Sequence, residues 1–137
     1  MGQLPPPFLG VHMWAHVMIE GYDGKSTVFI DGTPRVPSEV GMLLSACTFY
    51  GWYPHVINLQ VGDEWAYDKM KARGREDDKI EQDLWGRIEW FHTSVLPTIE
   101  LLRESSLVTF HDIQGEQTIE CVHADIVHSL GLSEDAA

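Results

Sequence analysis

The chain has 137 residues, of which 44% are hydrophobic and 22% charged, and its formal net charge at pH 7 is −12. These values are typical of one globular domain and exclude a fully disordered chain, while the negative charge opposes binding to duplex DNA. Neither a signal peptide nor an apolar run of the ~20 residues that a membrane span needs is present. We therefore expect one cytoplasmic domain over 1–137, loose at 1–10 and 132–137, with no membrane contact.

The first elements are predicted to be a β-hairpin. Residues 12–20 form a short apolar stretch, which is typical of a strand buried on both faces. Asp23 and Gly24 are a strong hairpin turn signal. The β-branched and aromatic residues 26–31 then predict the return strand.

A helix and a third strand should follow this hairpin. Ser38 can cap a helix that runs to about Tyr50, and Gly51 is a plausible stop. Residues 56–61 alternate over their second half, which favours a strand. Residues 63–75 are ambiguous and could hold a short helix that ends at Gly74.

The longest predicted element is an amphipathic helix of about 27 residues that begins at residues 76–78. Its apolar residues recur at three- and four-residue steps from Ile80 to Leu102. Three carboxylates at its start complement the helix dipole. Pro97 should kink it, because proline removes a backbone hydrogen bond and clashes with the preceding turn.

The C-terminal part is predicted to hold a second hairpin and a short helix. Residues 107–113 and 117–122 flank a glycine-containing turn, and 124–130 should be helical. Because strands and helices do not alternate strictly, we predict an α+β fold. It would have a mostly antiparallel sheet of about five strands, packed against one long kinked helix and two shorter ones.

No cluster of metal ligands stands out among the seven histidines. His12 and His16 would be about 13 Å apart along the expected strand, too far to share one ion. No His or Cys pair has the short spacing of a structural zinc site, although the sequence leaves open whether His111, Cys121 and His123 converge. We predict that the protein holds no metal.

Catalytic and cofactor motifs are also absent. The sequence contains no Gly-x-Ser-x-Gly, Walker A or Gly-x-Gly-x-x-Gly pattern. Cys47 and Cys121 are expected as reduced thiols packed in the core. Glu20 and Glu120 are the best candidates for a carboxylate in an apolar pocket. We predict no catalytic residue and no cofactor, and we favour a protein that is not an enzyme.

Charge and aromatic residues indicate a protein partner. Four of the nine basic residues lie in 69–75, where flanking acids should leave a salt-bridged loop, and no Lys or Arg follows Arg103. The aromatic stretch 49–53 resembles an interface hot spot, although these rings could instead close the core. The expected partner-binding residues are three aromatic and three acidic side chains, namely Tyr50, Trp52, Tyr53, Glu116, Glu120 and Asp125.

Three functions fit these features. The leading hypothesis is an acidic inhibitor that binds a basic protein such as a nuclease, a toxin or a nucleic-acid-handling complex. It would resemble immunity or anti-CRISPR proteins in charge and size, and could mimic nucleic acid. The alternative is a small enzyme or small-molecule-binding domain, with a pocket lined by His and carboxylate side chains between the long helix and the sheet. The third is a structural or assembly protein that forms a homodimer through the Trp85 and Trp90 side of the long helix.

Overall fold

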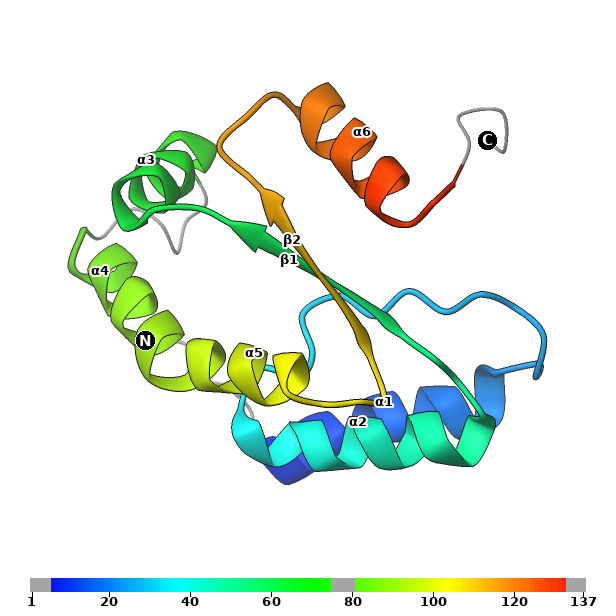
Figure 1. Ribbon diagram of the computed structural model, residues 1–137. Coiled ribbons are helices and arrows are strands. Elements are labelled where there is room, and N and C mark those ends of the chain that lie inside the picture. The colour runs from blue at the N-terminus through cyan, green and yellow to red at the C-terminus, as the bar shows by residue number, and fades with distance from the viewer. Residues whose placement is uncertain (1–5, 75–80, 133–137) are drawn as a thin grey trace.

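A computed structural model describes residues 6–74 and 81–132 of the chain. Helices predominate, and two strands cross the middle of the molecule (Figure 1). The helices and strands in chain order are α1 (Pro7–Gly21), α2 (Pro37–Tyr50), β1 (His55–Gln60), α3 (Asp63–Arg73), α4 (Glu81–Trp90), the π-helical segment η2 (Phe91–Val95), α5 (Leu96–Arg103), β2 (Thr109–Gln114) and α6 (Ile119–Ser129).

The sheet contradicts the predicted fold class. Within the described residues it has two strands, β1 and β2, and they run parallel, with His55 opposite Thr109 and Gln60 opposite Gln114. Parallel neighbours need a long crossover connection, which α3, α4, η2 and α5 provide. The expected antiparallel sheet of about five strands is therefore wrong, because three of its strands are helical or unpaired.

The first predicted strand is the helix α1. Pro7 occupies its first turn, where a missing N–H costs nothing. Trp14 and Met18 are half-buried while Met13 and Val17 are exposed, so burial follows a helical period. The sequence concealed this period because apolar residues occur on every side of the helix.

The predicted return strand at 26–31 has no hydrogen-bonded neighbour strand in the described structure. The turn before it does form, because the Asp23 carboxylate accepts hydrogen bonds from the backbone N–H groups of Lys25 and Ser26. Gly24 adopts a φ of 76°, which glycine tolerates without strain. The turn was therefore predicted correctly, but the hairpin was not.

The C-terminal hairpin is also replaced by a helix. Strand β2 is confirmed, and Gly115 then passes so close to β1 that a Cβ atom there would lie 2.7 Å from Val61. Thr118 caps α6 by accepting a hydrogen bond from the Cys121 N–H. Residues 119–122 are consequently the first turn of a helix that includes most of the predicted short helix.

Helix α2 agrees with the predicted helix in extent and supplies three of the seven buried apolar residues of the described chain. The predicted cap is wrong, because the helix begins at Pro37 and Ser38 makes no capping hydrogen bond. The helix ends at Gly51, whose φ of 68° is left-handed, as expected for a glycine stop. Val40, Leu43 and Cys47 are buried against Leu102 of α5. This packing fixes α5 against α2 and leaves its opposite side facing the sheet.

The predicted long helix is a continuous helical run from α4 through η2 to α5, and it changes direction at η2 (Figure 1). Its buried stripe includes Leu84, Ile88 and Leu102, as predicted, whereas its expected start at 76–78 lies outside the described residues. The Leu96 N–H bonds to the Phe91 carbonyl, five residues back. This wider turn lies directly before Pro97, where the sequence predicts a kink.

No helix in the described part of the chain is long and apolar enough to cross a membrane.

Candidate functional site

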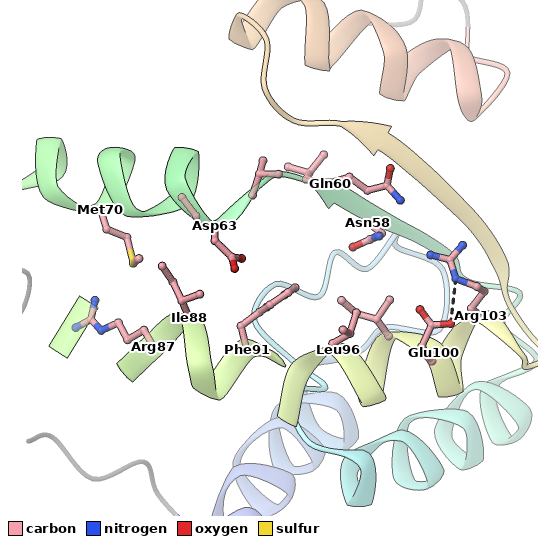
Figure 2. A pocket seen from close by; sticks show the side chains of 14 residues that line it. Asn58, Gln60, Asp63, Met70, Arg87, Ile88, Phe91, Leu96, Glu100 and Arg103 are labelled. Atoms are coloured by element: carbon pink, nitrogen blue, oxygen red, sulfur yellow. Dashed lines mark ion pairs between the residues drawn. The ribbon is translucent and has the colours of Figure 1, made fainter. Parts of the chain in front are cut away.

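A cavity of about 490 Å³ separates β1 and α3 from the helical run of α4, η2 and α5 (Figure 2). It begins at the carboxyl half of β1, which is where parallel α/β folds place their ligands. The side chains that line it are Asn58, Leu59, Gln60, Val61, Asp63, Ala66, Met70, Arg87, Ile88, Phe91, Leu96, Ile99, Glu100 and Arg103.

The cavity is apolar in the middle and polar at its margins. Ile88, Phe91 and Leu96 project from the helical run toward β1 and α3 (Figure 2). Arg87 lies near one end and Arg103 near the other (Figure 2). An apolar centre with a few polar groups around it is the usual composition of a small-molecule site.

One carboxylate organises the Arg103 end of the cavity. Asp112 of β2 accepts two hydrogen bonds from the Arg103 guanidinium and one of 2.8 Å from the Asn58 amide. These donors, Arg103 first, lower the pKa of Asp112 to about 2. The same contact raises the pKa of Arg103, which also lies 3.6 Å from Glu100 and over the Phe110 ring. Arg103 is therefore committed to a network within the protein.

A second polar contact joins the two walls of the cavity. Asp63, in the first turn of α3, lies 3.0 Å from His92 Nε2 through each of its carboxylate oxygens. His92 belongs to η2, next to the cavity residue Phe91. The contact therefore ties the start of α3 to the point where the helical run changes direction.

The predicted aromatic partner site is largely internal. Tyr50 and Trp52 are half-buried and stack at 4.7 Å between ring centroids. Trp52 Nε1 donates a hydrogen bond to the Tyr22 hydroxyl, which lies at the end of α1. Phe49 and Tyr53 are more than four-fifths exposed. Most of this group therefore joins α1 to α2, and Tyr53 is the member of the predicted site that faces solvent.

The three predicted partner-binding carboxylates have local hydrogen-bonding roles. Glu116 accepts a 2.6 Å hydrogen bond from the Gly62 N–H and so ties the loops that follow β1 and β2. Glu120 lies in the first turn of α6, where backbone and Thr118 hydrogen bonds lower its pKa. Asp125 accepts a 2.6 Å hydrogen bond from Gln117. None of the three lines the cavity, and their role in partner binding stays a prediction.

The potential metal ligands do not form one cluster. His12 and His16 stack with ring centroids 6.1 Å apart, because the expected strand that would have separated them is the helix α1. His111 contacts His55 across the sheet at 2.9 Å, whereas Cys121 and His123 are exposed on α6. Among the described residues no three His, Cys, Asp or Glu side chains gather closely enough to hold a metal ion.

The two thiols differ in their surroundings. Cys47 is 1% exposed, as predicted, and burial raises its pKa. Cys121 was expected in the core, but it is exposed and free. The difference follows from the misassigned strand, because residue 121 lies on the outer side of α6.

The basic cluster is helical in its described part. Lys69 and Lys71 lie on α3, over the rings of Trp65 and Tyr67 at 4.9 and 5.7 Å. Arg73 ends the helix, and residue 75 lies outside the described range. The expected loop is therefore wrong for 69–73, whereas the short helix that the sequence left open, with Gly74 as its stop, is confirmed.

Asn58, Arg103 and Asp112 were not found by sequence reasoning. Each is an ordinary residue for its element, and their sequence neighbours show no motif. A parallel register that places Asn58 opposite Asp112 would have revealed the pair, but the register depends on a crossover that the sequence pattern did not predict.

The fold and the cavity together indicate the class of domain. Parallel strands joined by a helical crossover, with a cavity beside the carboxyl end of one strand, are typical of α/β domains that bind small molecules. No protein-family model matches the chain.

Individual proteins do match it, and several of them are adenylate kinases. The adenylate kinase of Corynebacterium glutamicum (strain R) is 25% identical over 131 residues, which is 95% of this chain and 69% of the relative. Adenylate kinase 1 of Synechocystis is 28% identical over 105 residues, 76% of this chain and 54% of the relative. The adenylate kinase of Prochlorococcus marinus (strain NATL2A) is 27% identical over 103 residues, which is 74% of this chain and 55% of the relative.

These similarities contradict the leading sequence hypothesis. A chain that resembles adenylate kinases over most of its length is not explained as an acidic inhibitor, an immunity-like or an anti-CRISPR-like protein. Acidic composition does not distinguish an inhibitor, because many ordinary proteins share it. The findings fit the alternative better, and a cavity lies where that alternative places one, between the helical run and the sheet. Its polar lining differs in having arginine and amide side chains in place of histidine.

Proposed function

We propose that the chain is a nucleotide-binding domain related to adenylate kinases, and that it binds an adenine mononucleotide in the cavity between β1 and the helical run. The observation that carries the proposal is the similarity to an adenylate kinase over 95% of the chain. Adenylate, the nucleotide in that relative's name, is the natural first ligand to test.

The cavity supports this proposal in size and chemistry. Its volume of about 490 Å³ lies within the range of ligand pockets. Phe91 and Leu96 offer apolar surface to a purine, while the amides of Asn58 and Gln60 offer hydrogen bonds to its polar edge.

The phosphate is assigned to the Arg87 end of the cavity. Arginine binds phosphate through paired hydrogen bonds. Arg103, at the other end, lies beside the carboxylates of Asp112 and Glu100, whose negative charges would repel a phosphate. In the proposed binding mode the base therefore lies beside Asn58 and the phosphate lies beside Arg87.

Phosphoryl transfer is a further step that the cavity alone does not provide. The Gly-x-x-x-x-Gly-Lys-Ser/Thr loop that cradles the phosphates in many nucleotide enzymes does not occur in this sequence. The relatives are also longer than this chain, which covers 69% of one and 54% of another. We therefore limit the proposed function to binding.

A pair of variants on α3 tests the proposal by calorimetric titration with adenosine monophosphate. Ala66 lines the cavity, whereas Ala72 is exposed in the last turn of the same helix. We expect the wild-type protein to bind with a Kd between about 1 μM and 1 mM. Ala66→Phe fills the cavity and should weaken binding at least about tenfold, whereas Ala72→Phe should leave it unchanged. No measurable binding by the wild type, or equal binding by both variants, would refute the assignment.

A further inference from the structure

The side-chain amide of Asn58 is hydrogen-bonded to Asp112 and also lines the cavity. The two residues lie opposite each other in the parallel register of β1 and β2. Asn58 Nδ2 donates a 2.8 Å hydrogen bond to Asp112 Oδ1. Asn58 also lines the cavity, whereas Asp112 does not.

The charge of Asp112 leaves this amide only one orientation. An ionised carboxylate accepts hydrogen bonds and cannot donate them. The two Arg103 hydrogen bonds keep Asp112 ionised and occupy both of its oxygens. Rotating the amide by half a turn would place the Asn58 oxygen against the Asp112 oxygen, two acceptors with no proton between them.

The oxygen of Asn58 is therefore the atom offered to a ligand. Figure 2 shows the nitrogen of Asn58 on the side of Arg103 and its oxygen on the side of the cavity's centre. A carbonyl oxygen held in this way accepts a hydrogen bond from an amino group. It repels another carbonyl oxygen, because neither atom carries a proton.

Purine bases differ in whether the group at carbon 6 donates or accepts a hydrogen bond. Adenine carries an amino group there, a donor, whereas guanine and hypoxanthine carry an oxygen, an acceptor. We propose that Asp112, by fixing the Asn58 amide, makes the cavity select purine nucleotides with a 6-amino group over those with a 6-keto oxygen. This inference rests on the proposed function. Asp112 acts as a positioning residue, since it does not line the cavity itself.

The size of the preference follows from one hydrogen bond. A donor that meets the Asn58 oxygen forms a hydrogen bond, whereas a keto oxygen there leaves two acceptors facing each other with no proton between them. Such a difference corresponds to roughly tenfold in affinity. The ratio of the two affinities, and not either affinity alone, therefore reports on the orientation of the amide.

The test compares adenosine monophosphate with inosine monophosphate, which carries hypoxanthine. Both are titrated calorimetrically into the full chain. The wild type should bind the adenine nucleotide about tenfold more tightly. Asp112→Asn gives Asn58 a partner that either donates or accepts, so the amide can turn, and the ratio should fall below about threefold. Asp125→Asn is the matched control, because its carboxylate accepts a hydrogen bond from Gln117 outside the cavity, and its ratio should equal that of the wild type.

A second variant covers the case in which Asp112→Asn fails to fold. Asn58→Ala leaves the Asp112–Arg103 pair in place and removes the selecting oxygen, so the preference should also disappear. A wild-type ratio near one overturns the inference while leaving the proposed function intact, and so does a tenfold ratio in either Asp112→Asn or Asn58→Ala. If the wild type binds neither nucleotide, the proposed function fails and this inference fails with it.

Discussion

Asp112 shows how one side chain can hold several elements in place. It lies on β2 and is bonded by Asn58 of β1 and by Arg103 at the end of α5. Arg103 in turn covers the Phe110 ring, so the carboxylate also fixes a cation over an aromatic face. Removing this one charge should affect the sheet and the helix packed beside it.

Acid should remove the contribution of Asp112 to stability. Its pKa in the folded protein is lowered to about 2 by Arg103 and Asn58, so the unfolded chain takes up the proton first as the pH falls. The stabilisation is complete above about pH 4, the ordinary range of an aspartate, and is lost as the pH falls toward 2. Asp112→Asn should therefore lower the free energy of unfolding by about 1 kcal/mol at pH 7, a value discounted for the partial exposure of the pair.

Urea unfolding of both proteins at several pH values measures this effect. The difference in the free energy of unfolding between wild type and Asp112→Asn should decrease steadily as the pH falls from 4 toward 2. Asp125→Asn serves as the control. A difference of constant size down to the lowest pH would show that the charge of Asp112 is not what stabilises the protein.

At the scale of elements, two threonines of the helical run, one in η2 and one after Pro97, differ in burial. Thr93 and Thr98 both donate their hydroxyl hydrogens to backbone carbonyls of the run. Thr98 is fully buried, at 0% exposure, whereas Thr93 is exposed. A buried carbonyl cannot exchange a lost donor for water, so the two hydroxyls should differ in importance.

Thr98→Val and Thr93→Val test that difference. Valine keeps the shape of threonine and removes the donor. Thr98→Val should lower the free energy of unfolding by about 1 kcal/mol, because the Ser94 carbonyl loses its 2.8 Å hydrogen bond in the core. Thr93→Val should change it by less than about 0.5 kcal/mol. Equal effects in urea denaturation would argue against a structural role for the buried hydroxyl.

The elements predicted correctly have local signals at both ends or a clear burial stripe. Helix α2 begins at Pro37, one residue before the predicted cap, and stops at Gly51 as predicted, and its buried residues follow a helical period. In helix α1 the apolar residues of the sequence show no such period, because they also include exposed residues such as Phe8 and Val17. A short apolar stretch of this kind cannot be distinguished from a buried strand by pattern alone. The strand predicted after Gly115 failed for another reason, since Thr118 was not recognised as a helix cap.

The cavity could be anticipated only in outline. A pocket between a long helix and a sheet follows from an amphipathic helix that must cover a sheet face, so its location was predictable. Its polar residues were not, because Asn58 and Asp112 are 54 residues apart. Only parallel pairing brings them together, and the missed crossover concealed that pairing.

At the scale of the molecule, the net charge of −12 should destabilise the folded state at low ionic strength. Between about 0.01 M and about 0.1 M salt the Debye length falls from about 30 Å to about 10 Å, so repulsion between distant carboxylates is screened. We expect the Tm at neutral pH to rise by about 3 °C over this range. Differential scanning calorimetry measures it.

The isoelectric point provides the control for this experiment. Near pH 4.8 the net charge is close to zero, so added salt should no longer raise the Tm. A Tm that falls with salt at neutral pH would mean that screened ion pairs, such as Arg103–Asp112, outweigh the long-range repulsion.

The parallel pairing of β1 and β2 also has a consequence for synthesis on the ribosome. Chains emerge N-terminus first, at roughly 5–20 residues per second. Helix α2, strand β1 and the helical run are therefore available before β2 appears, and one wall of the cavity can pack early. Of Asn58, Arg103 and Asp112, Asp112 is synthesised last, nine residues after Arg103. Until then the Asn58 amide has no fixed orientation, so every residue that lines the cavity is synthesised before the residue that gives the cavity its preference among ligands.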